Sequence, residues 1–188
     1  MQALLICTGV VALAEIGDKT QLLALVLAAR YRKPWPIIFG ILVATLANHA
    51  LAGAVGAWLA ATIGPTAMRW ILGISFIAMA VWTLIPDKYE ESSPALPRLG
   101  IFGTTTLAFF LLEMGDKTQI ATVALAAQYD SLVTVIAGTT LGMLIANIPA
   151  VLLGEVAARK LPLRLVHGVA AAIFLALGIL VLFGVGLP

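Results

Sequence analysis

Two blocks of seven residues carry most of the polar chemistry in this chain. They read Glu15-Ile16-Gly17-Asp18-Lys19-Thr20-Gln21 and Glu113-Met114-Gly115-Asp116-Lys117-Thr118-Gln119. Carboxylate, amide and hydroxyl oxygens are the ligands that Ca²⁺, Mn²⁺ and Mg²⁺ prefer in proteins. The one cysteine, Cys7, lies about 12 Å before Glu15 along a helix, which disfavours zinc or copper. We predict a divalent metal site whose ligands are Glu15, Asp18, Gln21, Glu113, Asp116 and Gln119, with the hydroxyls of Thr20 and Thr118 available nearby.

The net charge of the two blocks also favours a doubly charged ligand. Four carboxylates and the amines of Lys19 and Lys117 leave a charge of −2, which one divalent cation would balance. In an alternative interpretation, Glu15 pairs with Lys19 four residues later on the same helix. That pairing would leave Asp18 without a partner, so we favour the ion site.

The spacing of the polar residues brings them together. Glu15, Asp18 and Gln21 are three residues apart and would share one face of a continuous helix. Gly17 could instead permit a local break in the helix. A break would free backbone carbonyls as further ligands, as in the discontinuous helices of transporters.

The composition indicates a membrane protein around these blocks. The 188 residues are 62% hydrophobic and 11% charged, whereas soluble domains are about 45–50% apolar and about 25% charged. The net charge of +2 is too small to suggest nucleic-acid binding. A span needs about 20 apolar residues. We predict an all-α polytopic membrane protein with six transmembrane helices, in the apolar stretches 3–29, 36–60, 68–85, 100–127, 132–157 and 163–186.

Both polar blocks fall near the middle of a predicted span, the first and the fourth. An ionised side chain at the centre of a bilayer costs about 2.5–3.5 kcal/mol even on a lenient scale. Residues this costly must face one another, water or a bound ion. Their position therefore indicates function.

The chain contains an internal repeat with an offset of 98 residues. Residues 11–31 and 109–129 are identical at 11 of 21 positions. Small residues recur every fourth position in the following spans, where they let helix backbones approach closely. Each half has three spans, so the second half should enter the membrane from the opposite side, as in many secondary transporters. We predict a first three-helix repeat over 1–86, a cytoplasmic linker over 87–98 and an inverted three-helix repeat over 99–188.

Basic residues predict the orientation. Eight lysines and arginines lie in the loops after the first, third and fifth spans, and Arg69 alone lies on the other side. The positive-inside rule places those loops in the cytoplasm and both termini outside. We expect a multi-pass protein of the inner (plasma) membrane.

Three polar residues in other spans are secondary candidates. Asn48 and His49 lie in the second span, and Asn147 lies in the fifth. The repeat offset places Asn147 opposite His49, and a slip of one residue places it opposite Asn48. They could complete the cation shell, and His49 could relay protons. The alternative is an interhelical hydrogen bond, which we favour for His49 and leave open for the asparagines.

The two blocks resemble the hallmark of the Gdt-type cation:proton exchangers, the uncharacterised protein family 0016, in which Glu-x-Gly-Asp-Lys/Arg-Thr/Ser occurs twice. The repeat and the central charged linker match as well, so the resemblance covers essentially the whole chain. It implies exchange of Mn²⁺ or Ca²⁺ for protons, and the bacterial members resemble manganese exporters. It also implies that Glu15, Asp18, Glu113 and Asp116 are cation ligands.

We therefore expect a secondary active transporter that exports a divalent cation, Mn²⁺ before Ca²⁺, in exchange for protons by alternating access. The metal ion and protons would be its substrates, and no cofactor or enzymatic activity is expected. A passive divalent channel is the alternative of the same class. A membrane-embedded metalloenzyme is the alternative from another class, disfavoured because polar substrates would sit nearer the interface. A scaffold role is the third alternative.

Overall fold

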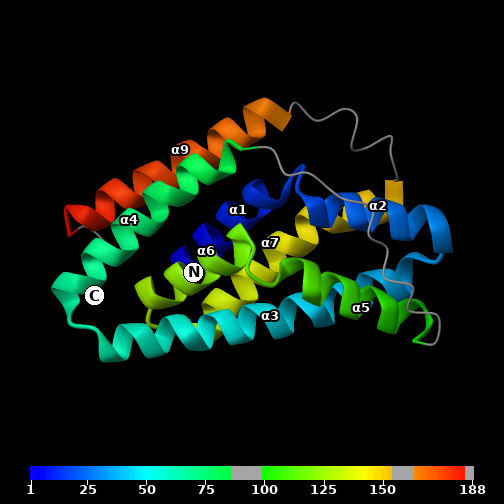
Figure 1. Ribbon diagram of the computed structural model, residues 1–188, viewed down its shortest axis with the longest axis horizontal. Coiled ribbons are helices and arrows are strands. Elements are labelled where there is room, and N and C mark those ends of the chain that lie inside the picture. The colour runs from blue at the N-terminus through cyan, green and yellow to red at the C-terminus, as the bar shows by residue number, and fades with distance from the viewer. Residues whose placement is uncertain (86–98, 154–162, 185–188) are drawn as a thin grey trace.

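A computed structural model describes residues 1–85, 99–153 and 163–184 of the chain (Figure 1). All regular structure in these ranges is helical, as predicted. The predicted linker over 87–98 and the end of the predicted fifth span lie outside the described residues. The helices are α1 (Gln2–Glu15), α2 (Lys19–Tyr31), α3 (Pro34–Thr62), α4 (Pro65–Thr83), α5 (Gly100–Glu113), α6 (Lys117–Gln128), α7 (Leu132–Leu153) and α9 (Leu163–Leu182).

Four of the described helices are long and apolar enough to cross a membrane, namely α3, α4, α7 and α9. The first and fourth predicted spans are each divided into two shorter helices, α1 with α2 and α5 with α6. Both divisions fall within the polar blocks. The helical architecture is thus that of a polytopic membrane protein with two interrupted segments.

The sequence repeat is reproduced in the helix boundaries. Each of α5, α6, α7 and α9 begins 98 residues after its counterpart α1, α2, α3 or α4. In Figure 1, α1 runs from left to right and α5 from right to left, and α3 and α7 also run in opposite directions. The broken helix of each half packs on the long helix of the other half. Thus α1 packs on α7, and α5 packs on α3.

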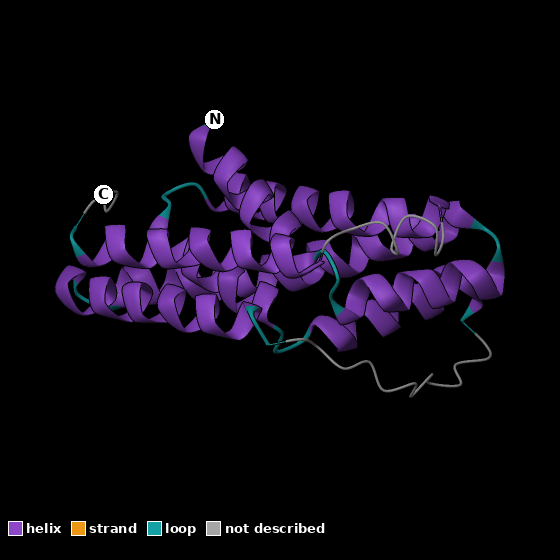
Figure 2. Cartoon of the chain, turned by 90° about the horizontal axis from the view of Figure 1, so that it is seen from above, coloured by secondary structure: helices purple, strands orange, loops and turns teal. Residues whose placement is uncertain are grey.

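In the view turned by 90°, most helices run roughly along the long axis of the molecule, and the helix at the N-terminus is inclined to it (Figure 2). One group contains α1, α2, α3, α5, α6 and α7, and α4 and α9 pair along one side of it (Figure 1). This pair is close because Gly73 lies against Gly178 at the crossing. Phe76 stacks on Phe174 with ring centroids 6.4 Å apart.

Small residues bring the central helices together, as the sequence predicted. A Cβ atom added to Gly142 of α7 would lie 2.6 Å from the carbonyl oxygen of Thr8 in α1. At Gly40 of α3 it would lie 2.7 Å from Cβ of Thr105 in α5. Lipid provides no hydrophobic drive between helices, so such close van der Waals packing holds them together.

Candidate metal centre

Each polar block contains a helix break of the same geometry. Gly17 and Gly115 have φ angles of +86° and +79°, a region that side chains disfavour and glycine adopts freely. The next residue, Asp18 or Asp116, has an extended backbone. Its N–H donates to the carbonyl of the preceding glutamate, Glu15 or Glu113, at 3.0 Å in both breaks.

The breaks explain how the acidic residues converge. Each glutamate is the last residue of one helix, and each aspartate immediately precedes the next. The break that Gly17 made possible is therefore present. The shared face expected on a continuous helix for Glu15, Asp18 and Gln21 is wrong, because Asp18 lies outside both helices.

The two glutamines brace the breaks. Gly17 N–H donates to Oε1 of Gln21 at 2.9 Å, and Gly115 N–H donates to Oε1 of Gln119 at 2.6 Å. Gln21 also donates from Nε2 to the carbonyl of Ala146 on α7, at 2.9 Å. Both amide oxygens predicted to bind metal thus already accept a backbone hydrogen bond.

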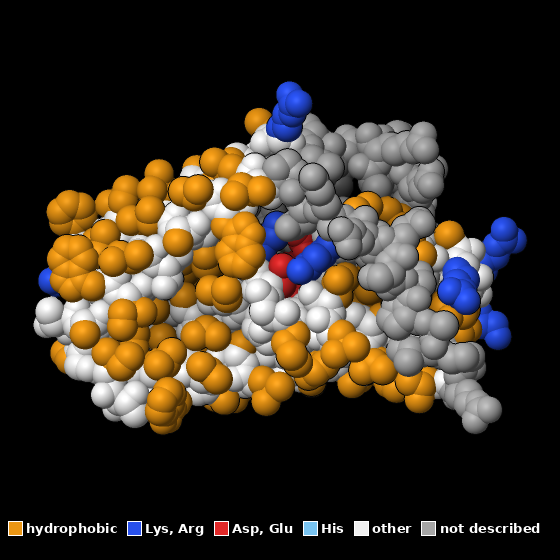
Figure 3. All heavy atoms as spheres, in the orientation of Figure 1, with side chains coloured by type: hydrophobic (Ala, Val, Ile, Leu, Met, Phe, Trp, Pro, Cys, Tyr) orange, Lys and Arg blue, Asp and Glu red, His pale blue; other side chains and the backbone are white. Residues whose placement is uncertain are grey.

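Three of the four predicted carboxylate ligands form a cluster. Glu15, Glu113 and Asp116 each place one oxygen within 4.8 Å of the others. Their exposed fractions are 0%, 1% and 3%. Oxygens that ligate one Ca²⁺ at 2.3–2.6 Å lie at most about 5 Å apart, so the cluster fits a single cation. Figure 3 shows acidic and basic side chains together near the middle of one face, with hydrophobic side chains beside them.

The fourth carboxylate is engaged elsewhere. Asp18 Oδ1 lies 2.8 Å from Nζ of Lys117, and both side chains are buried. Lys19 Nζ lies 2.7 Å from Oδ1 of Asp116. Each lysine therefore pairs with the aspartate of the other half. The alternative in which Lys19 neutralises Glu15 on its own helix names the wrong partner, and Asp18 has a partner after all.

The two glutamates of the cluster differ in hydrogen bonding. Thr20 donates to Oε2 of Glu15 at 2.5 Å, and Thr118 donates to its Oε1. Among the described residues, neither oxygen of Glu113 has a hydrogen-bond partner, and neither does Oδ2 of Asp116. A buried carboxylate oxygen without a partner is costly. These oxygens therefore have the free coordination positions that a cation or a proton would fill.

Asn48 supports the second break. Its Nδ2 donates to the carbonyl of Phe110 in the last turn of α5 at 3.0 Å, and its Oδ1 lies 3.5 Å from Nε2 of Gln119. The interhelical hydrogen bond that was left open for the asparagines is therefore present for Asn48, between α3 and α5. At the first break, the equivalent glutamine, Gln21, donates to the carbonyl of Ala146. Ala146 is therefore the counterpart of Asn48, as the offset of 98 residues gives, and the alignment that slips by one residue is wrong.

The other two secondary candidates lie apart from this network. Asn147 donates to the carbonyl of Met143 on its own helix at 3.1 Å. His49 is fully buried, and neither ring nitrogen has a hydrogen-bond partner among the described residues. The interhelical hydrogen bond favoured for His49 is therefore wrong.

The structure adds one residue that sequence reasoning missed. Nε2 of His167, on α9, lies 2.9 Å from the carbonyl oxygen of Ile16 in the first break. A carbonyl only accepts, so the imidazole donates from Nε2. The counterpart of His167 at the repeat offset is Arg69. The signal available in the sequence was this difference between the halves, a histidine where the repeat offset aligns an arginine.

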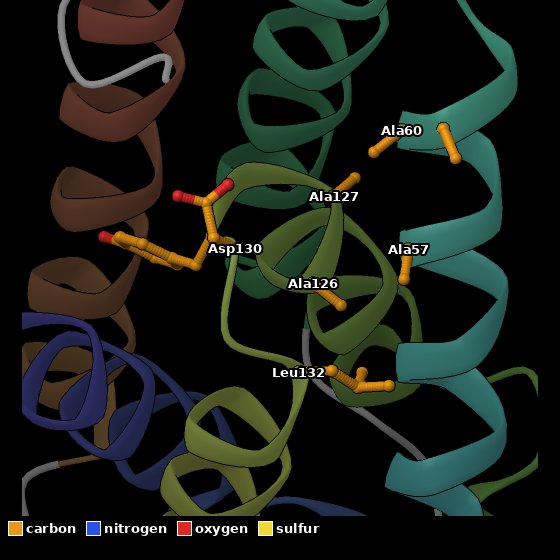
Figure 4. A pocket seen from close by; sticks show the side chains of 8 residues that line it. Ala57, Ala60, Ala126, Ala127, Asp130 and Leu132 are labelled. Atoms are coloured by element: carbon orange, nitrogen blue, oxygen red, sulfur yellow. The ribbon is translucent and has the colours of Figure 1, made fainter.

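A separate cavity of about 310 Å³ lies where α3 and α6 end and α7 begins (Figure 4). Of the described residues that line it, most are alanine and Asp130 is the one acidic residue. None of the clustered carboxylates lines it. The cavity therefore does not offer a metal site of its own. The lining residues are Ala57, Ala60, Ala61, Ala126, Ala127, Tyr129, Asp130 and Leu132.

Comparison with known proteins agrees with this chemistry. A family model described as "Divalent cation/proton antiporter GDT1" matches residues 3–91 and 101–186. A Vibrio cholerae protein named "Putative manganese exporter" is 53% identical over 184 residues, covering 97% of this chain and 92% of that protein. A GDT1-like protein of Synechocystis is 29% identical over 183 residues, covering 87% of this chain and 88% of that protein.

No solved structure matches the chain. The family match includes both polar blocks and confirms the resemblance inferred from them. The chain belongs to the GDT1 family of divalent cation/proton antiporters.

Proposed function

We propose that this protein exports Mn²⁺ across the inner (plasma) membrane in exchange for protons, with Ca²⁺ as the second candidate cargo. The observation that carries the proposal is the buried cluster of Glu15, Glu113 and Asp116. Its ligands are hard oxygens, which suit both ions. The relative named as a manganese exporter supports Mn²⁺ as the first choice.

The cluster supplies a reason for proton coupling. Three buried carboxylates within 4.8 Å of one another repel strongly unless positive charge neutralises them. A divalent cation can do so, and so can protons, but a metal binds only deprotonated ligands. Metal and protons therefore occupy the cluster alternately. The oxygens of Glu113, which have no hydrogen-bond partner within residues 1–85, 99–153 and 163–184, are the natural place for this competition.

The two halves supply a route for alternating access. The cluster joins Glu15 of the first half with Glu113 and Asp116 of the second. Corresponding helices run in opposite directions (Figure 1), which supports an inverted repeat of two three-helix units. In this proposal the halves rock around the carboxylates, with both termini outside and the basic loops in the cytoplasm.

The test is transport by the purified full chain in proteoliposomes. We expect Mn²⁺ to be driven uphill by an imposed pH gradient and to stop when an ionophore collapses the gradient. Movement of Mn²⁺ only down its own gradient would instead identify a passive channel. Turnover of a phosphate or lipid substrate without ion movement would favour a membrane-embedded metalloenzyme.

A matched pair of variants links transport to the cluster. Glu113→Gln removes a clustered carboxylate and should abolish uphill transport. Asp130→Asn removes an exposed carboxylate that lines the separate cavity, and should transport like the unmodified protein. Equal activity of the two variants would reject the cluster as the transport site.

A further inference from the structure

The two lysines of the polar blocks occupy equivalent positions in the repeat but have different surroundings. Lys19 lies 2.7 Å from Asp116, and its side chain is 22% exposed. Lys117 lies 2.8 Å from Asp18, and its side chain is only 2% exposed. One ion pair therefore reaches the surface while the other is enclosed.

The acidic partners of the two lysines also differ. Asp116 belongs to the carboxylate cluster and still has one oxygen, Oδ2, without a hydrogen-bond partner among the described residues. Asp18 is not a member of the cluster. Lys19 therefore sits directly on a carboxylate that the cation would need. Lys117 also interacts electrostatically with Glu15, but its ion-pair partner lies outside the cluster.

We propose that Lys19 is a tethered cation that competes with the transported metal for Asp116, whereas Lys117 is a fixed counter-ion for Asp18. This inference rests on the proposed function, because it takes the cluster as the metal site. The ammonium of a lysine is a hydrated point charge on a flexible stem. That of Lys19 has room to move away from Asp116, because its side chain is partly exposed.

Lys117 lacks this freedom. Its removal would take the ion-pair partner from a buried carboxylate, which is strongly unfavourable. The same residue type at the same repeat position therefore serves two purposes. Lys19 pairs with Asp116 when the metal leaves and so assists its release. Lys117 keeps the second break in contact with the first through its ion pair with Asp18.

The experiment measures Mn²⁺ binding to the purified full chain, using the electron paramagnetic resonance signal of free Mn²⁺. Removing the competing charge in Lys19→Gln should tighten binding by at least about tenfold. Lys19→Arg keeps a positive charge at Asp116 and should bind less tightly than Lys19→Gln. In proteoliposomes, Lys19→Gln should lower KM and also lower kcat, because release becomes slow.

Lys117→Gln is the matched control at the equivalent position. It should tighten Mn²⁺ binding less than Lys19→Gln does, because its ion-pair partner lies outside the cluster, and it should lower the melting temperature. If it does not fold, the double variant Lys117→Gln/Asp18→Asn removes both buried charges and provides the same comparison.

Three outcomes would overturn the inference. Unchanged or weaker binding by folded Lys19→Gln would exclude competition at Asp116. Equal tightening in Lys19→Gln and in the Lys117 control would remove the distinction between the lysines. A folded, unmodified protein that binds no Mn²⁺ would overturn the proposed function, and with it this inference.

Discussion

The two helix breaks have nearly identical sequences and backbones, yet their glutamates differ in hydrogen bonding. Glu15 accepts hydrogen bonds from Thr20 and Thr118, whereas neither oxygen of Glu113 has a hydrogen-bond partner among the described residues. A local motif therefore fixes the geometry of each break. The neighbouring helices decide which carboxylate is held and which is available to a cation or proton.

The supports of the two breaks differ in the same way. The first break is held through the Ile16 carbonyl by His167 of α9. The second is held through the Phe110 carbonyl by Asn48 of α3. A repeat of this kind can keep its shared site while its two halves acquire different roles.

The largest expected difference between the halves is in stability. Lys117→Gln removes the ion-pair partner of a buried carboxylate, Asp18, which should lower the free energy of unfolding by about 3–5 kcal/mol. Lys19→Gln also removes the partner of a buried carboxylate, Asp116, but this pair is partly exposed and therefore partly screened, so the loss should be smaller. Thermal unfolding of both variants in detergent measures the contrast. Equal melting temperatures would mean that the burial of the two pairs does not matter.

The next contrast is between the glutamates. Glu113→Gln should reduce the rate of Mn²⁺ transport at least about a hundredfold, because it removes the carboxylate with free coordination positions. Glu15→Gln should additionally lower the free energy of unfolding by about 1–3 kcal/mol, because two buried hydroxyls lose a charged acceptor. Transport assays with unfolding measurements separate the two effects. A larger stability loss in Glu113→Gln would reverse the assignment.

The pH dependence of binding sharpens the same contrast. Protons and metal compete for the clustered carboxylates, so lowering the pH should weaken Mn²⁺ binding by up to about tenfold per pH unit for each proton displaced. Glu113→Gln should flatten this dependence, since one competing site is lost. Mn²⁺ titrations across the pH range in which the protein stays folded provide the measurement. A slope unaffected by Glu113→Gln would place the competing proton elsewhere.

The smallest expected effects concern the two supports. His167→Ala and Asn48→Ala should each cost about 0.5–1.5 kcal/mol, the usual net value of one hydrogen bond. Amide hydrogen exchange should accelerate over 15–18 in the first variant and over 113–116 in the second. Acceleration of both segments in both variants would show that the breaks open together, with no separate support.

Much of the architecture could be predicted from the sequence. Composition and hydropathy indicated a helical membrane protein, and the offset of 98 residues anticipated the helix starts. The acidic members of the cluster were all among the predicted ligands, because buried carboxylates in apolar stretches are too costly to lack a purpose. The glycine at the centre of each block was the signal for the breaks.

The pairings could not be predicted, because they depend on contacts between distant segments. Sequence spacing suggested Lys19 with Glu15, but the break turns Lys19 toward Asp116 of the other half. Gln21 and Gln119 are capable metal ligands by chemistry, and only the positions of the Gly17 and Gly115 amides show that they brace the backbone. His167 has no motif, and its contact with Ile16 follows from the placement of α9.

The most direct test of the account is anomalous X-ray scattering from crystals of the full chain grown with Mn²⁺. The account predicts one manganese ion with oxygens of Glu15, Glu113 and Asp116 at about 2.0–2.6 Å, and an intact pair between Asp18 and Lys117. Manganese bound at Asp130 instead, or held by Asp18 after displacement of Lys117, would contradict it.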